Sequence, residues 1–171
     1  AGEIALMFCD VCYFDDIIKE CQDQVVEVLD ETFKAFDSIC KQYGVQKIET
    51  VGKTYFAVAG LKFAESKLPE SISQSDPIER VLSASQDFMK FVAEKPFMAG
   101  KHLVLKIGLH YGTCIFGVLG YHKPQFSLIG DTVNTTSRHC TTGDEGTINI
   151  SESAWIRIRA IKKIKTTVSL C

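Results

Sequence analysis

The chain has 171 residues, 46% of them hydrophobic, and a formal net charge of −2. This length predicts one domain spanning residues 1–171, which buries about 70% of its unfolded surface and needs no disulfides to fold. The hydrophobic share is too high for a disordered chain, and a charge so near zero argues against a general nucleic-acid binder, which carries a strong basic excess. The longest uncharged run, 107–121, contains four glycines and is shorter than the ~18 apolar residues of a membrane helix. The sequence therefore predicts no membrane segment in this stretch of chain.

The seven cysteines raise the question of disulfides or zinc, and their spacing favours neither. Cys9 and Cys12 form a C-x-x-C within an apolar run that indicates a strand, where positions three apart face opposite sides. A zinc site would also need a second Cys/His pair at ligand spacing, and the four histidines show none. We expect reduced, structural thiols in a reducing compartment.

Hydrophobic periodicity and turn residues predict the elements. Apolar residues recur at steps of three and four between Cys21 and Tyr43, which predicts a helix, and Gly44 is a natural C-terminal stop. Asp76-Pro77, with Glu79 three residues after the cap, is typical of the start of a second helix. In chain order we expect a strand at 4–14, the first helix up to 43, strands at 45–50 and 55–61 joined by a tight turn, an irregular loop at 62–75, the second helix ended by 96–101, strands at 103–111, 113–119 and 126–129, a helix at 132–140, a strand at 147–150, and a helix capped by Ser151 and running to about 159.

This order, β-α-β-β-α-β-β with small additions, is the split βαβ pattern. It predicts an α+β fold with a ferredoxin-like βαββαβ core, added strands and short helices. We expect an antiparallel-rich sheet with its helices on one face. The fold alone implies no function, because it hosts many.

Several residues could carry chemistry, and each also has a purely structural interpretation. Asp10 lies within the first strand, where an acidic residue is rarely left without a partner, so it is either a metal ligand near the strand end or a cap on a neighbouring turn. The segment 48–55, with Glu49 and Lys53, is either functional or a charged hairpin tip. His110 lies among glycines in a strand region and is expected to be a packing histidine.

Asn134 and Arg138 lie four residues apart on a predicted helix, so they share one face. An amide and a guanidinium on one face suit a ribose-phosphate ligand, because the amide orients a sugar oxygen and the guanidinium holds phosphate charge. The alternative is an exposed polar helix.

Together these segments closely resemble the catalytic domain of the class III nucleotide cyclases, the adenylyl and guanylyl cyclases. The resemblance runs from about Ile4 to Trp155. The motif Gly130-Asp131-Thr132-Val133-Asn134, followed by Ser137-Arg138, carries it most specifically. Further support comes from Ile107-Gly108-Leu109-His110, Gly112, Gly117, Gly120, Pro124 and the segment 55–60.

The resemblance implies a head-to-tail dimer with active sites between two domains. In the family, one domain supplies two Asp residues that hold two divalent ions, Mg²⁺ or Mn²⁺. The other supplies base-recognising residues, an Asn for the ribose and an Arg for the reacting phosphate, which here match Asn134 and Arg138. The 3′-hydroxyl attacks the α-phosphate and pyrophosphate leaves, helped by metal-assisted positioning and charge stabilisation.

The metal-binding half of the pattern is incomplete in this sequence. Asp10 matches the first metal Asp, but the second position is Lys53, and a cation there repels Mg²⁺. Tyr13 replaces the small Gly of the phosphate-binding turn. Lys106 lies where the metal-binding half often carries an Arg that contacts the γ-phosphate. The family's late triphosphate-binding lysine has no assigned counterpart among Lys162, Lys163 and Lys165.

Two residues bear on the base. Glu49 falls where guanylyl cyclases carry Glu and adenylyl cyclases carry Lys. A carboxylate accepts hydrogen bonds from guanine N1–H and the 2-amino group, whereas adenine presents an acceptor at N1. Ser127 occupies the second base position, usually Asp in adenylyl and Cys in guanylyl cyclases, and its hydroxyl can donate to guanine O6. Glu49 favours GTP as the substrate, and Ser127 is compatible with it.

The sequence therefore predicts the base- and transition-state-binding half of a guanylyl cyclase, which forms cyclic GMP and pyrophosphate from GTP and is inactive alone. A second cyclase domain, in another chain or in the same polypeptide, would supply both metal Asp residues. That domain would provide most of the ligands of the two ions. Formation of a homodimer by the isolated chain is a further alternative, because the family interface is pseudo-symmetric. We expect a cytoplasmic domain of a larger protein, membrane-anchored or not. The alternatives are a silent pseudo-cyclase that dimerises and regulates, an adenylyl cyclase half, and an unrelated βαβ-type binding module.

Overall fold

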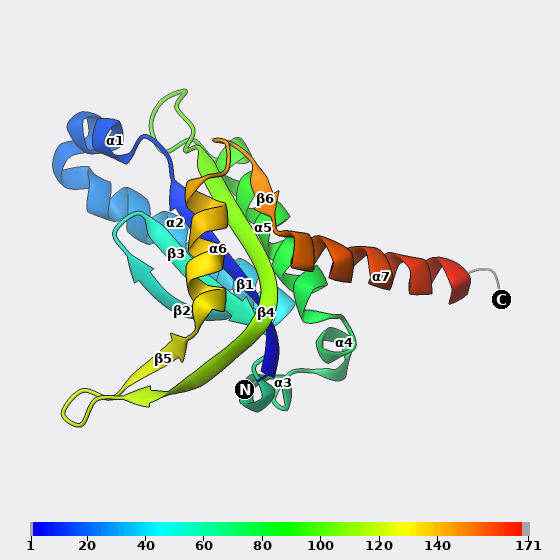
Figure 1. Ribbon diagram of the computed structural model, residues 1–171. Coiled ribbons are helices and arrows are strands. Elements are labelled where there is room, and N and C mark those ends of the chain that lie inside the picture. Colours follow the sequence, from blue (N-terminus) through cyan, green and yellow to red (C-terminus); the bar gives the residue numbers. More distant parts are fainter. Residues whose placement is uncertain (1, 169–171) are drawn as a thin grey trace.

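The computed structural model describes residues 2–168, with side chains as far as residue 162. Figure 1 shows one sheet with helices packed on both of its faces. The elements in chain order are β1 (Gly2–Val11), α1 (Phe14–Cys21), a 3-10 turn (Gln22–Gln24), α2 (Val25–Tyr43), β2 (Gln46–Val51), β3 (Thr54–Ala59), α3 (Lys62–Glu65), α4 (Glu70–Ser73), α5 (Pro77–Glu94), β4 (Leu105–Leu119), β5 (Gln125–Ile129), α6 (Asp131–Thr141), β6 (Ile148–Ile150) and α7 (Glu152–Val168).

The sheet confirms the split βαβ topology. Its strand order is β2-β3-β1-β4-β5, and every neighbour in this path is antiparallel. The long strand β4 pairs with two other strands besides β1. Its residues 107–109 pair in parallel with β6, and its residues 115–119 pair in antiparallel with β5. The outer part of β4 and β5 thus form a two-stranded arm.

The main core lies between the sheet and the helices α2 and α5. Alternate residues of β1 and β4, such as Met7 and Leu109, point into it. Phe36 of α2 and Phe88 of α5 stack there with ring centroids 3.8 Å apart. Burying side chains of this size stabilises the fold by roughly 1.5–3 kcal/mol each.

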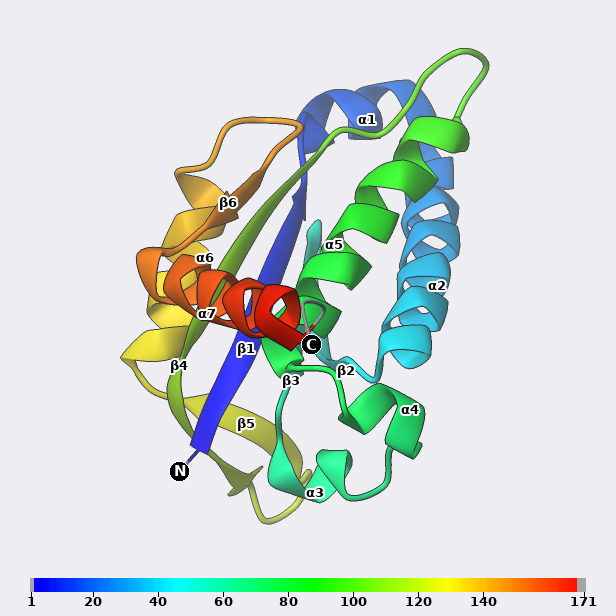
Figure 2. The same cartoon turned by 90° about the vertical axis from the view of Figure 1, so that its right-hand side faces the viewer.

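One helix departs from the expected layering. α6 lies on the opposite face of the sheet from α2 and α5, as Figure 2 shows, so the expectation of helices on one face is wrong for α6. The reason is Gly108 of β4. A Cβ built at this position would lie 2.2 Å from the backbone nitrogen of Cys140, so only a glycine lets the α6 backbone pack directly on the strand.

Helix and turn signals in the sequence are largely confirmed. The Asp76 carboxylate accepts from the Ile78 N–H at 3.1 Å and caps α5. Gly44 ends α2 with the left-handed φ of 63°, and Ser151 Oγ accepts from the Ala154 N–H at the start of α7. The β2–β3 hairpin forms as expected.

Five expectations need correction. The single helix expected through Cys21 to Tyr43 is divided, because Gln22, in the 3-10 turn between α1 and α2, takes the left-handed φ of 47°. The expected strand at 4–14 ends at Val11, because Tyr13 takes a left-handed conformation. The stretch 62–75 contains the short helices α3 and α4 instead of an irregular loop. The two strands expected around Gly112 are one continuous strand, since Gly112 pairs in register with Ile4. α7 runs to Val168 instead of about 159 and projects from the body (Figure 1). Within residues 2–168, no helix has the length and apolar content needed to cross a membrane.

Candidate functional site

Asp10 lies near the end of β1. Its register partners are Thr54 of β3 and Lys106 of β4. The Thr54 hydroxyl donates to Oδ1 of Asp10 at 2.6 Å, and Asp10 is only 6% exposed. Burial first, and then the charge of Asp10, raise the pKa of the nearby Cys140 thiol to about 12, so that thiol stays protonated beside the carboxylate. The Asp10 carboxylate is therefore enclosed by groups of this chain.

Lys53 lies in the tight turn between β2 and β3. Gly52, just before it, has the left-handed φ of 55° that such a turn requires. The Val11 N–H donates to the Lys53 carbonyl oxygen at 3.1 Å. This bond fixes the backbone of Lys53 beside the residue that follows Asp10, and the Lys53 side chain is exposed.

The groups at this end of the sheet do not fit a divalent ion. Mg²⁺ requires a near-octahedral set of oxygen ligands, with one or two carboxylates. Here the single carboxylate of Asp10 is bonded to a hydroxyl, and the next candidate position is the cation Lys53. Across residues 2–168, no three His, Cys, Asp or Glu side chains are grouped as a metal site needs. The described residues alone therefore do not assemble a centre for a divalent ion.

The turn that follows β1 keeps a glycine-like backbone without a glycine. Tyr13 has φ 56° and ψ 34°, in the left-handed region, which costs a non-glycine residue about 1–2 kcal/mol. Its hydroxyl donates to the Glu145 carboxylate in the α6–β6 connection. This contact holds the exposed Tyr13 ring across the end of the sheet.

An open hollow lies beside this turn. Its volume is about 420 Å³, within the roughly 300–1,000 Å³ typical of ligand pockets. The lining side chains come from the turn, the first part of α1 and the β2–β3 hairpin: Tyr13, Phe14, Asp15, Asp16, Lys19 and Lys53.

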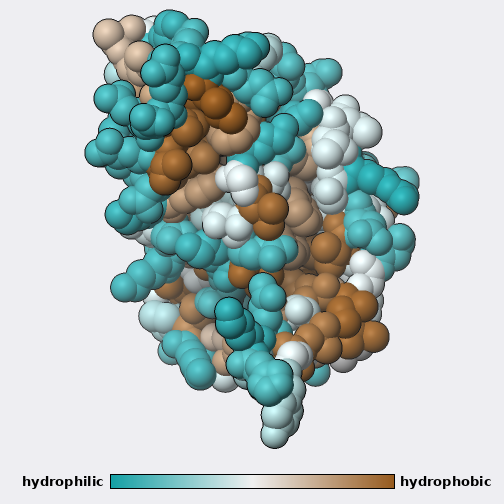
Figure 3. All heavy atoms as spheres, turned by 90° about the vertical axis from the view of Figure 1, so that its left-hand side faces the viewer, coloured by the Kyte–Doolittle hydropathy of each residue, from teal (hydrophilic) through white to brown (hydrophobic). Residues whose placement is uncertain are grey.

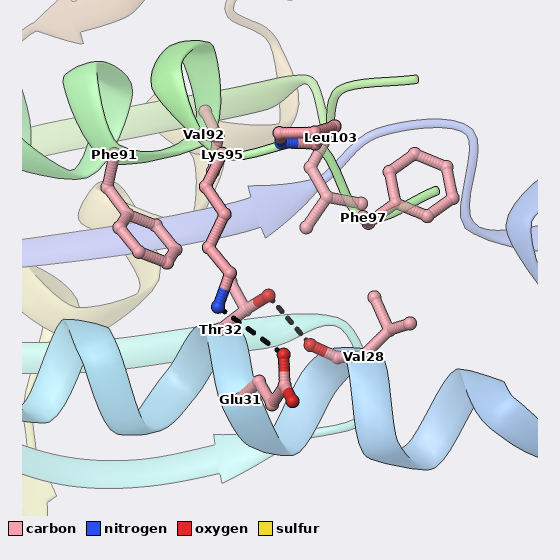
Figure 4. Close-up of a pocket in the computed structure, with 9 residues that line it drawn as sticks. Val28, Glu31, Thr32, Phe91, Val92, Lys95, Phe97 and Leu103 are labelled. Atoms are coloured by element: carbon pink, nitrogen blue, oxygen red, sulfur yellow. Dashed lines mark hydrogen bonds and ion pairs between the residues drawn. The ribbon is translucent and has the colours of Figure 1, made fainter. Parts of the chain in front are cut away.

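A second cavity lies between α2 and the end of α5. Figure 4 shows Lys95 reaching from the end of α5 toward Glu31 of α2, with 3.4 Å between the two charged groups. The Thr32 hydroxyl donates a hydrogen bond to the Val28 carbonyl oxygen at 2.7 Å. None of the candidate site residues lines this cavity, so it lies outside the site.

Asn134 and Arg138 lie on the outer face of α6. Both side chains are exposed, whereas Thr136 and Cys140 on the opposite face of the helix are buried. Among the described residues, neither the Asn134 amide nor the Arg138 guanidinium has a hydrogen-bond or ion-pair partner. An exposed amide and guanidinium at i and i+4 are thus available to a ligand.

Glu49 and Ser127 lie on the two outermost strands of the sheet path. Glu49, exposed on β2, follows a bulge and faces Phe56 in register, and Ser127 of β5 faces Gly117. The neighbours of both residues pack against one apolar cluster: Ile48 beside Glu49, and Phe126 and Leu128 on either side of Ser127. Both edges of the sheet therefore contribute side chains to one apolar cluster, on the face that carries α6.

Lys106 of β4 is held at the end of α6. Its ammonium donates to the Thr141 carbonyl oxygen at 3.1 Å, an orientation favoured by the negative end of the helix dipole. Its backbone lies opposite Asp10. Asp10, Lys53 and Lys106 are therefore brought together, whereas the other candidates lie on α6 and on the outer strands.

His110 is a packing histidine, as expected. Its Nδ1 lies 2.8 Å from the Ser151 hydroxyl and 3.2 Å from the Ser153 hydroxyl. Burial is the main cause that lowers the pKa of His110, and the neighbouring His139 lowers it further.

The residues that sequence reasoning missed at the site are Thr54 and Glu145. Both contacts depend on which strand or loop lies alongside, and no signal in the sequence indicates either residue.

Residues 1–168 match the model of the family described as the adenylate and guanylate cyclase catalytic domain. The receptor-type guanylate cyclase gcy-4 of Caenorhabditis elegans is 32% identical over 154 residues, which cover 88% of this chain and 13% of that protein. This chain thus spans only about an eighth of the length of such relatives.

Solved structures agree with the sequence comparison. The guanylate cyclase domain of RhGC from Catenaria anguillulae in complex with GTP has a TM-score of 0.79 and 30% identity, over 92% of this chain and 84% of that one. The non-canonical dimeric guanylyl cyclase domain of the RhoGC fusion protein from the aquatic fungus Blastocladiella emersonii has a TM-score of 0.80 and 29% identity, over 94% and 85% of the two chains.

Proposed function

This chain belongs to the family of adenylate and guanylate cyclase catalytic domains, and on that premise we propose that it is one half of a guanylyl cyclase site. GTP is cyclised to cyclic GMP and pyrophosphate at an interface with a second cyclase domain. One observation carries the proposal: Asn134 and Arg138 are exposed together on α6 and have no partners among the described residues. At the metal-binding end, by contrast, Asp10 is enclosed and the second metal position is occupied by Lys53. The chain is equipped to bind a nucleotide and lacks the carboxylates for two ions.

The base is recognised by Glu49 and Ser127. The Glu49 carboxylate accepts from guanine N1–H and from the 2-amino group, and the Ser127 hydroxyl donates to O6. Support comes from the apolar cluster on the α6 face of the sheet, to which residues adjacent to both Glu49 and Ser127 contribute. Adenine presents an acceptor at N1, which mismatches the Glu49 carboxylate, whereas its C6 amino group can donate to the Ser127 hydroxyl. Glu49 is therefore the residue that discriminates between the two bases.

Asn134 orients the ribose and Arg138 binds the reacting phosphate. The 3′-hydroxyl oxygen forms a bond to the α-phosphorus and loses its proton, while the bond from the α-phosphorus to the bridging oxygen breaks and pyrophosphate leaves. Negative charge gathers on the phosphoryl oxygens during this displacement, and the planar guanidinium of Arg138 stabilises it through paired N–H donors. Lys106 lies opposite Asp10 in the incomplete metal-binding half, so it is proposed to contact nucleotide phosphates from that half and not beside Arg138.

The partner domain supplies both metal Asp residues and with them the two Mg²⁺ or Mn²⁺ ions that class III cyclases use. Its docking is supported by the β4–β5 arm, where Ile115, Val118, Leu119 and Ile129 are all more than half exposed. Figure 3 shows apolar surface toward the bottom right of this side of the molecule. An apolar patch of this kind is typical of an interaction site. The complete protein is proposed to be larger, with this domain in the cytoplasm.

The proposal is tested by mixing this chain with a cyclase domain that has Asp at both metal positions. Arg138→Ala should lower cyclic GMP formation in the mixture by about 10²–10³-fold, the usual loss when one transition-state donor is removed. The matched control is Arg159→Ala, another exposed arginine on α7, which should leave turnover unchanged. Unaffected turnover in the Arg138 variant would contradict the assignment.

A silent regulatory domain is the second candidate function, and Lys53 and Tyr13 favour it because both depart from the family's metal-binding half. Asn134→Ala distinguishes the two functions in the same mixture. If it lowers turnover while leaving dimerisation intact, the domain takes part in catalysis. If turnover is unchanged, the domain only dimerises.

A further inference from the structure

The helix α7 projects from the body of the domain, as Figure 1 shows. Its inner face is fixed to that body, because Ala154 and Ile158 are buried and Ile161 packs against the main core. Arg157 also joins the helix to the start of α5, through the Asp76 carboxylate at 2.7 Å. The domain therefore holds α7 in place and leaves its other side uncovered.

The uncovered side of α7, its outer face, combines exposed apolar and basic side chains. Trp155, Arg159 and Lys162 are exposed and follow one another at i, i+4 and i+7, so they share one side of the helix. Ile156, next to Trp155, is 59% exposed. Among the residues whose side chains the structure describes, Arg159 has no hydrogen-bond or ion-pair partner. Its guanidinium is thus available to an anionic group.

The charge of the chain is unevenly distributed, and α7 is a basic segment of it. Residues 152–168 contain five basic residues and one acidic residue, whereas the whole chain has a net charge of −2. The remainder of the chain is therefore net negative. Asp76, an acidic group beside α7, is already paired with Arg157. An anionic surface would attract α7 and repel the remaining body, so the charges orient the molecule with α7 toward such a surface.

Two kinds of anionic partner suit a basic helix, and the residue pattern separates them. A protein groove binds an amphipathic helix through apolar anchors at i, i+3 or i+4, and i+7. In α7 the apolar residues at that spacing are Ala154, Ile158 and Ile161, which already pack against the domain. The outer face offers only the adjacent pair Trp155 and Ile156 and then cations. A lipid surface suits this pattern, because an indole lies at the level of the headgroups and basic side chains bind anionic lipids.

We propose that the outer face of α7 binds an anionic lipid surface, with the helix lying on the membrane and not across it. Trp155 and Ile156 enter the headgroup region, and Arg159 and Lys162 contact the lipid phosphates. The six charged residues among the 17 of α7 exclude a membrane-spanning helix. The cytoplasmic leaflet is the anionic one, so this contact agrees with the cytoplasmic location proposed above. It would bring the domain to a membrane surface through its own residues.

Trp155 makes the contact observable, because it is the only tryptophan of the chain. The test titrates the 171-residue chain with vesicles of equal parts phosphatidylcholine and phosphatidylserine, without nucleotide or partner domain. The chain should co-sediment with these vesicles, and Trp155 emission should shift to shorter wavelength and be quenched by brominated lipid. Salt should reverse the binding by screening, and vesicles of phosphatidylcholine alone should give no signal. Absence of binding to the mixed vesicles, or equal binding to both kinds, would overturn the proposal.

Matched variants test whether the binding belongs to the outer face of α7. Arg159→Gln should weaken binding to the mixed vesicles about fivefold, the contribution of one cation near an anionic surface. Lys41→Gln, at an exposed lysine on α2, makes the same charge change and should bind like the unmodified chain. Equal losses in both variants would overturn the assignment to α7. Co-sedimentation without a change in Trp155 emission would overturn the lipid contact in favour of a purely electrostatic one, as an acidic protein surface would make.

The outcome is independent of the proposed cyclase function, because the vesicle assay contains neither GTP nor a second domain. Failure to bind lipid leaves the assignment of Asn134 and Arg138 untouched. Conversely, a loss of that assignment leaves the vesicle result standing. Arg159→Gln, like Arg159→Ala, should keep full turnover in the mixture in solution, where no lipid is present.

Discussion

In the proposed function, the side chain at position 49 decides which purine the site accepts. A carboxylate can only accept hydrogen bonds, and an ammonium can only donate them. Glu49→Lys should therefore lower the kcat/KM for GTP relative to that for ATP by about 10²-fold or more, as in sites that read a ligand's donors. Rates of both cyclisations in the mixed assembly measure this ratio.

The matched control for that substitution is Glu27→Lys on α2, at an exposed glutamate outside the base-reading strands. It makes the same charge change and should leave the ratio as it is. A Glu49→Lys variant that keeps its preference unshifted would favour the adenylyl cyclase half instead, an alternative left open by Ser127.

The residues of the site differ in how far sequence could identify them. Asn134 and Arg138 follow from a motif and a helical spacing, so one segment of chain suffices. The hydrogen bond from Thr54 to Asp10 depends on the register of two strands. The contact of Tyr13 with Glu145 joins positions far apart in the chain. Sequence periodicity contains neither the register nor the loop packing.

At the scale of elements, the seating of α6 on β4 positions Asn134 and Arg138. Gly108→Ala should cost about 1–3 kcal/mol, the usual penalty for overpacking, because the added Cβ would lie 2.2 Å from the Cys140 nitrogen. The backbone on both sides must move to relieve the clash. Thermal unfolding followed by circular dichroism measures the effect as a fall in Tm.

Gly117→Ala is the control for Gly108, since it lies on the same strand and an added Cβ there would have nothing within 4 Å. It should change stability by no more than about 0.5 kcal/mol. Equal Tm values for the two variants would show that α6 is not seated through Gly108.

Elements with local signals were predictable, and elements placed by tertiary contacts were not. The Asp76 cap and the Gly44 stop are read from neighbouring residues. Gly108 of β4 marks the close approach of the α6 backbone. The face of the sheet on which α6 lies is set by that approach, and the amphipathic pattern of a helix does not reveal it. The segment 62–75 is polar overall, and its two short helices begin after Leu61 and Pro69.

At the scale of the whole molecule, the sheet separates two groups of candidate residues. The enclosed end holds Asp10, Lys53 and Lys106, and the residues proposed to read the nucleotide lie on α6 and the outer strands. In a homodimer of this chain, each site would combine Asp10 and Lys53 with Glu49, Asn134 and Arg138. Such a site is one metal carboxylate short, so self-association does not create a complete centre.

The chain alone should therefore form negligible cyclic GMP at any protein concentration, whether or not it dimerises. Adding a cyclase domain with Asp at both metal positions should restore turnover, which rises until the two chains are equimolar and then levels off, because each heterodimer has one productive site. Cyclic GMP formation against mixing ratio measures this, with sedimentation velocity to report association. Full activity of the isolated chain would contradict the division of the site between two domains, since Lys53 would then be compatible with a complete ion centre.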